Sequence, residues 1–494
     1  MSRNSCDIVI VGGGTAGAVL AARLSEDGRR RVVLLEAGPV FPPDSFPLSV
    51  ASSAFIGRAT GFDWGYSARP SRTPLPRGRM IGGSSAMNGT VAMRALPADF
   101  ARWTRRGIPG WSWSDVLPDY TRLERADAPC MTHRGRNGPV PVHQLRRNEL
   151  STLQRGFLSA SRRLGYQPTD FNGTAPHGSA PYPVNAVHGT RVNTAMAYLS
   201  ASVRARPHLR IESDTLVDRV LVRGHRVTGV VLAGGDTLHA PDVILSAGTY
   251  GSAALLLRSG IGPQRHLRQL GIPMVQELPV GTAYRDHPLL QLACLAWPWR
   301  ADRPRSVAAA AVWTASASAP PGELDLHVGI MQPVMPVPVP AFTLIAGVTR
   351  PRSHGTITLS SRDPRAAPRI HPRWLNDERD RDRLAQAMAL AHRLTRTHPL
   401  ARMIACRLFP DPGAMPPARL HRLLKMSVGT FHHPSSSAPM GPAGDPRAVV
   451  DAVGRVHGVD GLRVIDASIF PDAPSAPTDL TVIMTAEHIA RTMR

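Results

Sequence analysis

A short apolar run that leads directly into a glycine-rich turn constrains this 494-residue chain more than any other feature. Residues 7–11 read DIVIV, a β-branched run typical of buried parallel strands. The turn GGGTAG (12–17) follows, and residues 18–28 have the apolar spacing of a helix that ends at a glycine. A second apolar strand, 31–35, completes the pattern. It predicts a Rossmann-like α/β domain at the start of the chain.

The spacing of the glycines in this turn suits a bound dinucleotide. Gly12 permits the tight turn from strand to helix, Gly14 lets the backbone approach a pyrophosphate, and Gly17 lets helix and strand pack closely. The start of the helix offers free amide hydrogens and a partial positive charge to phosphate oxygens. The predicted phosphate-binding residues are Gly12, Gly14, Thr15, Ala16 and Gly17.

Glu36 ends the second strand, 24 residues after Gly12, where a carboxylate can accept hydrogen bonds from a ribose. Its negative charge argues against NADP, whose extra phosphate it would repel. NAD and FAD are both compatible with these first forty residues.

The net charge of +22 does not indicate a nucleic-acid partner. Lys425 is the single lysine, so the other 57 of the 58 basic residues are arginine, a bias typical of GC-rich coding. The arginines are scattered, and no basic patch interleaved with aromatic residues accompanies them. We therefore expect no nucleic-acid binding, while an attraction to anionic membrane surfaces stays open.

The cysteines and the N-terminus favour a reducing compartment. Cys6, Cys130, Cys294 and Cys406 lie far apart without a CxxC pair, which argues against a disulfide framework and a zinc site, and we expect no metal. The N-terminus enters a strand at once, without the regions of a signal peptide. No unbroken apolar run is long enough for a transmembrane helix. We expect a cytoplasmic protein, with peripheral membrane association as an open alternative.

The next segments resemble the glucose-methanol-choline (GMC) oxidoreductases, in order along nearly the whole chain. Residues 76–79 (PRGR) and 80–89 (MIGGSSAMNG) are similar to the first signature of that family, whose backbone lies against FAD. Some members attach FAD through a histidine in this stretch, where this chain has alanine or methionine, so the resemblance implies non-covalent FAD. It implies cofactor contacts from Arg79, Gly82, Gly83, Ser84, Asn88 and Gly89.

Three later segments continue the resemblance. Residues 242–263 look like the second family signature, with a buried strand that ends at Ala247, and a predicted hairpin before it begins near Val217. In the family, backbone near Val217 meets the adenine. Residues 278–288 are similar to the family's return toward the FAD domain, and residues 351–370 look like part of its substrate-domain sheet.

The C-terminal part carries the most specific similarity. In the family, a histidine followed by proline, and seven residues later by Met-Gly, lies at the flavin face; His433 and Met440 reproduce that spacing. The resemblance also implies cofactor contacts from Asp466, Ala467 and Thr478.

A histidine suits the reaction that this resemblance implies. Oxidising an alcohol removes the hydroxyl proton while the carbon-bound hydride moves to flavin N5, and an imidazole can act as the base. We therefore expect His433 to be that base.

Two departures from the family pattern concern the same site. Ser436, Ser437 and Ala438 stand where relatives have Gly-Thr-Cys, which removes no titrating group. Pro477 stands where most relatives have a second histidine or asparagine, and its side chain cannot form hydrogen bonds. Our hypothesis is that Asp479 or His432 orients the substrate hydroxyl instead; the alternative for Asp479 is a helix N-cap.

Several functions remain open within the resemblance. The main expectation is an FAD-dependent alcohol dehydrogenase or oxidase acting on small primary alcohols, with oxygen, a quinone or the respiratory chain as electron acceptor. Residues 135–145 and 436–441 look like the branch that accompanies mycofactocin biosynthesis, whose donor would be reduced mycofactocin. Other relatives retain FAD but cleave cyanohydrins, and a non-catalytic flavoprotein is a third class.

The motif positions imply a discontinuous FAD domain. We expect it to comprise residues 1–150, 201–282 and 428–494, with an antiparallel-sheet substrate domain from residues 151–200 and 283–427. The fold class is then α/β, or α+β over the whole chain, with the substrate pocket between the two domains.

Overall fold

A five-stranded parallel sheet forms the centre of one part of the molecule. The computed structural model describes residues 5–127, 133–300, 302, 304–334 and 340–493. β1 and β2 are buried along their whole length, because helices and loops cover both faces of the sheet. The predicted strand–turn–helix–strand unit is confirmed. The strand order is β22 (Leu462–Val464), β13 (Asp242–Leu245), β1 (Ile8–Val11), β2 (Val32–Leu35) and β9 (Leu209–Glu212).

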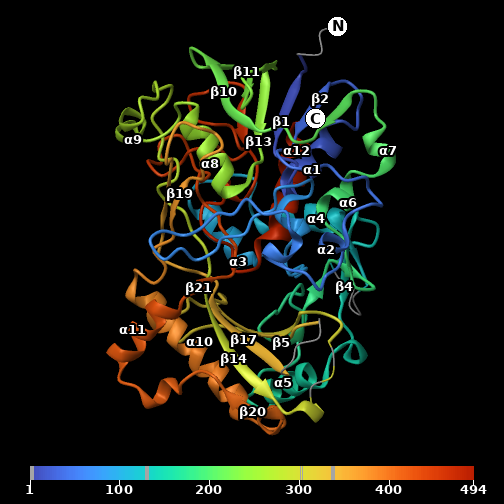
Figure 1. Ribbon diagram of the computed structural model, residues 1–494, viewed down its shortest axis with the longest axis vertical. Helices are drawn as coiled ribbons and strands as arrows, with labels where there is room; N and C mark the ends of the chain where they lie inside the picture. Colours follow the sequence, from blue (N-terminus) through green and yellow to red (C-terminus); the bar gives the residue numbers. More distant parts are fainter. Residues whose placement is uncertain (1–4, 128–132, 301, 303, 335–339, 494) are drawn as a thin grey trace.

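Helices from both ends of the chain pack beside this sheet. α1 (Thr15–Leu24) follows β1 and lies against α12 (Thr478–Thr492), so the glycine turn and the C-terminal segment meet (Figure 1). α8 (Gly248–Arg258) follows β13 directly. The hairpin predicted near Val217 is confirmed as β10 (Val217–Arg223) and β11 (Arg226–Leu232), with β12 (Thr237–His239) added at its edge.

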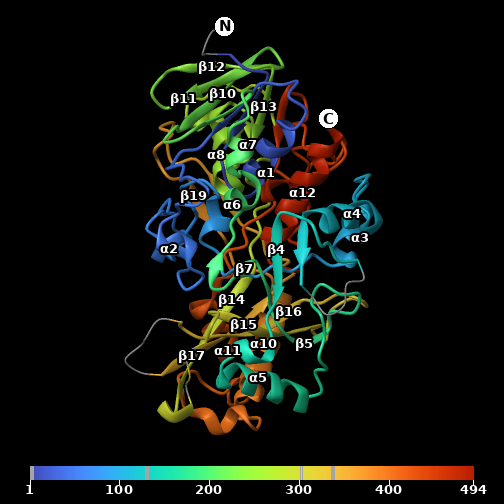
Figure 2. The same cartoon turned by 90° about the vertical axis from the view of Figure 1, so that its right-hand side faces the viewer.

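A seven-stranded antiparallel sheet forms the other part, below the first in Figures 1 and 2. α5 (Thr152–Arg163) and α10 (Glu378–Arg396) pack against it and share a buried apolar core with its strands. α11 (Pro417–Ser427) packs on α10. The strand order is β20 (Ile404–Arg407), β14 (Pro288–Ala296), β17 (Ala341–Val348), β16 (Leu326–Met331), β15 (Ala308–Thr314) and β5 (Gly178–Pro181), and β21 (Gly429–Thr430) also pairs with β14.

Two segments depart from the predicted division between the domains. β21 comes from a segment expected in the FAD domain, yet it pairs with β14 of the seven-stranded sheet. The expectation that residues 351–370 belong to the substrate-domain sheet is wrong: β18 (Thr356–Thr358) and β19 (Arg369–His371) form a separate two-stranded sheet. Their buried residues pack into the core of the five-stranded sheet, because Gly281 lets the β18 backbone approach closely.

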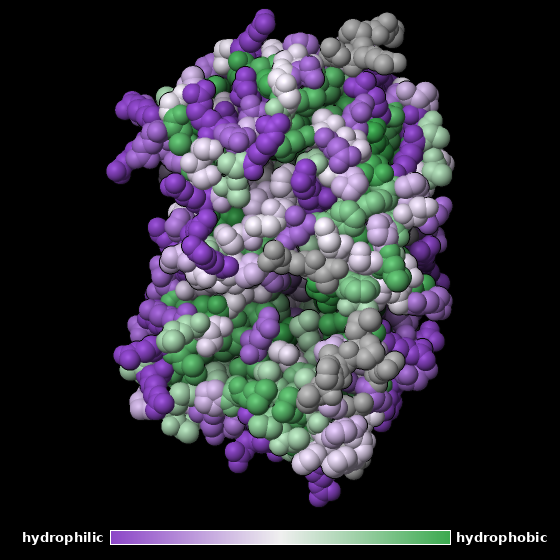
Figure 3. Space-filling model, in the orientation of Figure 1, coloured by the Kyte–Doolittle hydropathy of each residue, from purple (hydrophilic) through white to green (hydrophobic). Residues whose placement is uncertain are grey.

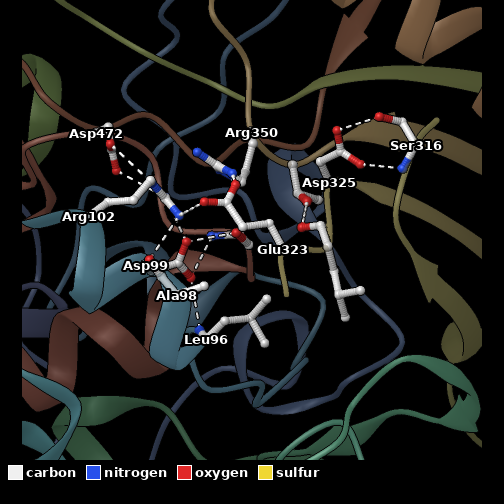
Figure 4. A network of polar contacts seen from close by, with 12 residues as sticks. Leu96, Ala98, Asp99, Arg102, Ser316, Glu323, Asp325, Arg350 and Asp472 are labelled. Atoms are coloured by element: carbon white, nitrogen blue, oxygen red, sulfur yellow. Dashed lines mark hydrogen bonds and ion pairs between the residues drawn. The ribbon is translucent and has the colours of Figure 1, made fainter. Parts of the chain in front are cut away.

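A polar network joins the two parts of the molecule (Figure 4). Arg102 of α3 (Pro97–Arg105) donates to Asp99 at 2.7 Å and to Asp472 at 3.2 Å, and its guanidinium lies 3.7 Å from Glu323 of the loop before β16. Glu323 also pairs with Arg350, which follows β17. This cluster, in which Asp99 and Glu323 are buried, therefore connects the part that holds the five-stranded sheet to the seven-stranded sheet.

No helix among the described residues is long and apolar enough to cross a membrane. Cys6, Cys294 and Cys406 are free thiols, and Cys130 lies outside the described residues. The face in Figure 3 intermixes hydrophilic and hydrophobic side chains.

The other helices and strands are α2 (Leu48–Ala51), α4 (Trp113–Leu123), β3 (Glu124–Ala126), β4 (Val140–Gln144), β6 (Pro183–Val184), β7 (Ala186–Val187), β8 (Thr190–Arg191), α6 (Thr194–Tyr198), α7 (Ala201–Arg204) and α9 (Gln264–Gln269).

Candidate active site

A cavity of about 490 Å³ lies between the two parts of the molecule. One end meets the glycine turn and the β13–α8 turn, and the other meets the inner face of the seven-stranded sheet. Its walls therefore combine the predicted dinucleotide-binding residues with the predicted base.

At Gly12 and Gly83 the backbone approaches its neighbours too closely for any side chain. Gly12 has a φ of +100°, and a Cβ there would lie 2.7 Å from the carbonyl oxygen of Ser246. A Cβ on Gly83 would lie 2.6 Å from the Cα of Gly14. A Cβ on Gly14 would meet nothing of the protein closer than 3.7 Å, so the backbone of Gly14 is open to the cavity. That is the cradle that a pyrophosphate needs.

Glu36 is held at the end of β2 by backbone amides. Its two carboxylate oxygens accept hydrogen bonds from Gly13 N at 2.8 Å and Gly38 N at 2.9 Å. Burial raises the pKa of Glu36, against these amides, which lower it. A carboxylate oriented in this way lines the cavity where a ribose hydroxyl pair would lie.

Asp466 organises the opposite wall. Its carboxylate accepts from Gly248 N at 2.9 Å, from the Ser252 hydroxyl at 2.6 Å and from Ser468 N at 2.7 Å. The neighbouring Ala467 thereby faces the cavity from the C-terminal segment. The β13–α8 turn and the C-terminal segment are thus joined through one buried carboxylate.

His433 lies on the same cavity and is held from several sides. Its Nδ1 lies 3.0 Å from Nδ1 of His287, and its backbone N–H donates to Asp286 at 3.0 Å. Its ring stacks on Phe431, with centroids 5.5 Å apart and planes 6° from parallel. The imidazole therefore has one nitrogen engaged by protein and the other left for a ligand.

Two more histidines line the cavity near His433. His327, on β16, shares a 2.8 Å hydrogen bond between its Nε2 and the Tyr182 hydroxyl. His432 has a φ of +63°, and its backbone carbonyl accepts from the Arg77 guanidinium at 2.9 Å. Nδ1 of His432 is buried and has no hydrogen-bond partner among the described residues.

Burial keeps these imidazoles neutral. Burial lowers the pKa of His287 to about 4 and that of His327 and His432 to about 3. It lowers the pKa of His433 well below its ordinary value, and the basic groups around that ring, His287 and Arg77 first, add to that effect. A neutral imidazole can accept a proton, which is what a general base must do.

Asp479 faces the glycine turn. The Thr15 hydroxyl donates to its carboxylate at 3.1 Å. Pro477 occupies the N-cap position of α12, and Asp479 is the second residue of the helix. The N-cap alternative for Asp479 is therefore wrong. Asp479 and His433 both line the cavity, but no hydrogen bond joins them among the described residues. The hypothesis that Asp479 orients a substrate hydroxyl stays untested, as does the same hypothesis for His432.

Comparison with known proteins identifies the family. Models of the GMC oxidoreductase family match residues 6–289 and 351–486. The chain belongs to the GMC oxidoreductases. It is therefore an FAD-dependent oxidoreductase, and the bare glycine cradle and the held carboxylates fit that cofactor.

Several GMC oxidoreductases are similar over almost the full chain. A 5-(hydroxymethyl)furfural oxidase of Methylovorus sp. (strain MP688) is 36% identical, with 98% of each chain covered. Mitochondrial choline dehydrogenase of Mus musculus is 32% identical, over 99% of this chain and 89% of that protein. The crystal structure of a pyridoxine 4-oxidase from Mesorbium loti is 32% identical, covers 99% of each chain and has a TM-score of 0.89.

Most of the predicted cofactor residues of this GMC oxidoreductase line the cavity, and three do not. Gly17 packs against the backbone of Gly12, where a Cβ would lie 1.9 Å from the Gly12 carbonyl oxygen. Gly82 has a φ of +88° and faces Asn193, and the exposed Arg79 lies over the Trp64 ring. The predicted residues that line the cavity are Gly12, Gly14, Thr15, Ala16, Glu36, Gly83, Ser84, Asn88, Gly89, Val217, Ala247, Asp466, Ala467, Thr478, Asp479, His432 and His433.

Sequence reasoning missed four residues of this GMC site. Asp286 and His287 stand in the segment 278–288, where an adjacent acid and histidine just before a strand was the available signal. His327 and Tyr182 lie in apolar strand patterns that give no such signal, because their pairing depends on how β16 packs.

Proposed function

We propose that this GMC oxidoreductase oxidises an uncharged primary alcohol to the aldehyde, with His433 as the base. The observation that carries the proposal is the neutral His433 imidazole on the cavity wall, with Nδ1 engaged by His287. Two relatives named for hydroxymethyl substrates, the 5-(hydroxymethyl)furfural oxidase and the pyridoxine 4-oxidase, support a primary alcohol as donor.

The residues account for each proton and charge. FAD, when bound, supplies the ring nitrogen N5 that accepts a hydride. The free nitrogen of His433 takes the hydroxyl proton as the carbon–hydrogen bond of the alcohol breaks, so the aldehyde leaves without charge. The carboxyl group of Asp286 accepts from the backbone N–H of His433 and so helps to hold that residue at the cavity wall.

The wall opposite the glycine turn favours an uncharged donor. Leu289 and Gln291 of β14, Met331 of β16 and Ile345 of β17 line the cavity there. Among the described residues of these strands, no carboxylate lines it, and the histidine beside them, His327, is neutral. The positive charge of a quaternary ammonium such as choline therefore has no carboxylate partner on these strands. We therefore expect choline to be a poor substrate, although one relative is a choline dehydrogenase.

Anaerobic bleaching of the flavin tests the proposal. The purified holoenzyme is mixed with 5-(hydroxymethyl)furfural, pyridoxine, benzyl alcohol, mycofactocinol and choline in separate runs, and the flavin absorbance is followed. We expect the neutral alcohols to bleach it and His433→Ala to slow bleaching about a hundredfold to ten-thousandfold with FAD still bound. His392→Ala, in α10, is the matched control.

Two outcomes would contradict the proposal. Flavin that stays yellow with every alcohol while a cyanohydrin is cleaved would indicate a lyase. Retained bleaching in His433→Ala would remove His433 as the base. Admission of air or a quinone after bleaching then identifies the electron acceptor, and bleaching by mycofactocinol alone would assign the donor to that class.

A further inference from the structure

The segment just before β14 holds His433 at two points. Asp286 accepts the backbone N–H of His433, and His287 lies with its Nδ1 3.0 Å from Nδ1 of His433. The two rings are nearly perpendicular, at 84°, with centroids 5.1 Å apart. His287 is fully buried, so water does not replace this contact.

The strand register makes this contact a fixed one. Pro288 pairs with Thr430 in the β14–β21 ladder, and Phe431 N donates to the carbonyl of His287 at 3.0 Å. The Thr430 hydroxyl bonds the other oxygen of Asp286. Backbone and side-chain bonds therefore join residues 286–288 to residues 430–433 in one register, and a rotation of either ring would break the contact between them.

One proton has to lie between the two Nδ1 atoms. Which of the two nitrogens carries it decides whether Nε2 of His433 can accept a proton. A neutral imidazole has one N–H and one bare nitrogen. If His287 donated, the proton of neutral His433 would lie on Nε2, and that nitrogen could not accept another. If His433 donates, its Nε2 is bare and can take a proton from a hydroxyl. In that case the proton of His287 lies on Nε2, a buried atom that makes no hydrogen bond among the described residues. The nearby backbone of Pro474 raises the pKa of His287, against burial, and so favours a proton on that ring.

We propose that His287 is a positioning residue that accepts the Nδ1 proton of His433 and so holds Nε2 of His433 bare toward the alcohol. The inference rests on the proposed function, since it concerns the tautomer of the proposed base. It also explains how the base is oriented where Pro477 offers no hydrogen-bonding side chain.

Two variants of His287 separate positioning from packing. His287→Asn keeps a hydrogen-bonding group at the place of Nδ1, whereas His287→Leu fills the space with carbon. We expect His287→Leu to lower the limiting rate of anaerobic flavin reduction about tenfold to a hundredfold, as loss of a tautomer-fixing partner does elsewhere. The alcohol concentration for half-maximal rate should change less than about threefold, and His287→Asn should recover most of the rate. His392→Leu, a mostly buried histidine of α10, is the control.

¹⁵N NMR spectroscopy determines the tautomer directly in the wild-type holoenzyme. ¹⁵N-labelled histidine shows whether Nδ1 or Nε2 of His433 is protonated, with the signal assigned by its loss in His433→Asn. We expect a protonated Nδ1 and a bare Nε2. A protonated Nε2, or equal rates for His287→Leu and the wild type, would overturn the inference. Wild-type flavin that no alcohol reduces would instead refute the proposed function, while the ¹⁵N result would still decide the tautomer.

Discussion

Thr15 and Asp479 are 464 positions apart in the chain, yet the Thr15 hydroxyl donates to the Asp479 carboxylate at 3.1 Å. The bond joins the start of α1 to the start of α12, and both residues line the cavity. Burial raises the pKa of Asp479 to about 6, against Thr15 and Asn88, which lower it. The N-terminal and C-terminal parts of the cofactor site are therefore coupled through a carboxyl group that ionises near neutral pH.

Asp479→Asn should stabilise the apoprotein above pH 6. A carboxyl whose folded pKa is raised contributes stability that is present below about pH 4 and lost as the pH rises through 6. Asparagine never ionises and still accepts from Thr15, so the gain should reach about 1–3 kcal/mol at pH 8 and vanish near pH 4. Urea unfolding at both pH values measures it, and an equal effect at the two would contradict the raised pKa.

The catalytic hypothesis for Asp479 needs a separate measurement. If Asp479 orients the substrate hydroxyl, Asp479→Ala should slow anaerobic flavin reduction at least about tenfold in protein that still binds FAD. Asp479→Asn should be affected less, because the amide retains an acceptor. Rates equal to wild type in both variants would confine Asp479 to its bond with Thr15.

Alanine substitutions at two glycines of the same turn should have different effects on folding and FAD binding. Gly14→Ala should fold but bind FAD poorly, because its methyl group has room in the protein yet points into the cavity. Gly17→Ala should unfold the domain, since its Cβ would lie 1.9 Å from the Gly12 carbonyl oxygen. Circular dichroism and bound flavin per chain distinguish the two. A Gly14→Ala protein that is fully yellow would show that the cofactor does not approach this position.

Loss of Arg102 should destabilise the protein more than loss of a half-exposed arginine does. Arg102→Met leaves Asp99, Asp472 and Glu323 without their shared cation, and loss of one partner from a buried ion pair typically costs about 3–5 kcal/mol. Arg122→Ala breaks an ion pair of a half-exposed arginine and should cost at most about 1 kcal/mol. Chemical unfolding compares the two variants, and equal losses would mean that the Figure 4 network does not stabilise the interface.

The buried histidines should make the apoprotein acid-sensitive. Because burial lowers the pKa of His287, His327 and His432, the unfolded chain binds protons that the folded chain does not as the pH falls below about 6.5. Stability should therefore fall from pH 6.5 toward pH 4.5. His327→Gln should reduce the slope by about one proton, or about 1.4 kcal/mol per pH unit. An unchanged slope would show that His327 is already charged in the folded state.

The position of the candidate base was predictable because its motif is local. His433 and Met440 lie within one short segment, and the structure places His433 on the cavity as expected. The segment 351–370 was misassigned because its alternating strands suit either sheet, and only the packing of Ile357 and Ile370 decides between them. Arg79 was expected at the cofactor by its place in a motif, but its side chain is exposed beside Trp64.

The sequence by itself determined the glycine turn, the acidic end of β2, the family and the candidate base, because each depends on residues that are neighbours in the chain. Only the tertiary structure decided what touches that base. His287 lies 146 positions from His433, and their contact exists because β14 pairs with β21 in one register. Pattern along the chain specifies backbone geometry at close range, whereas a hydrogen bond between distant side chains depends on the packing of whole sheets.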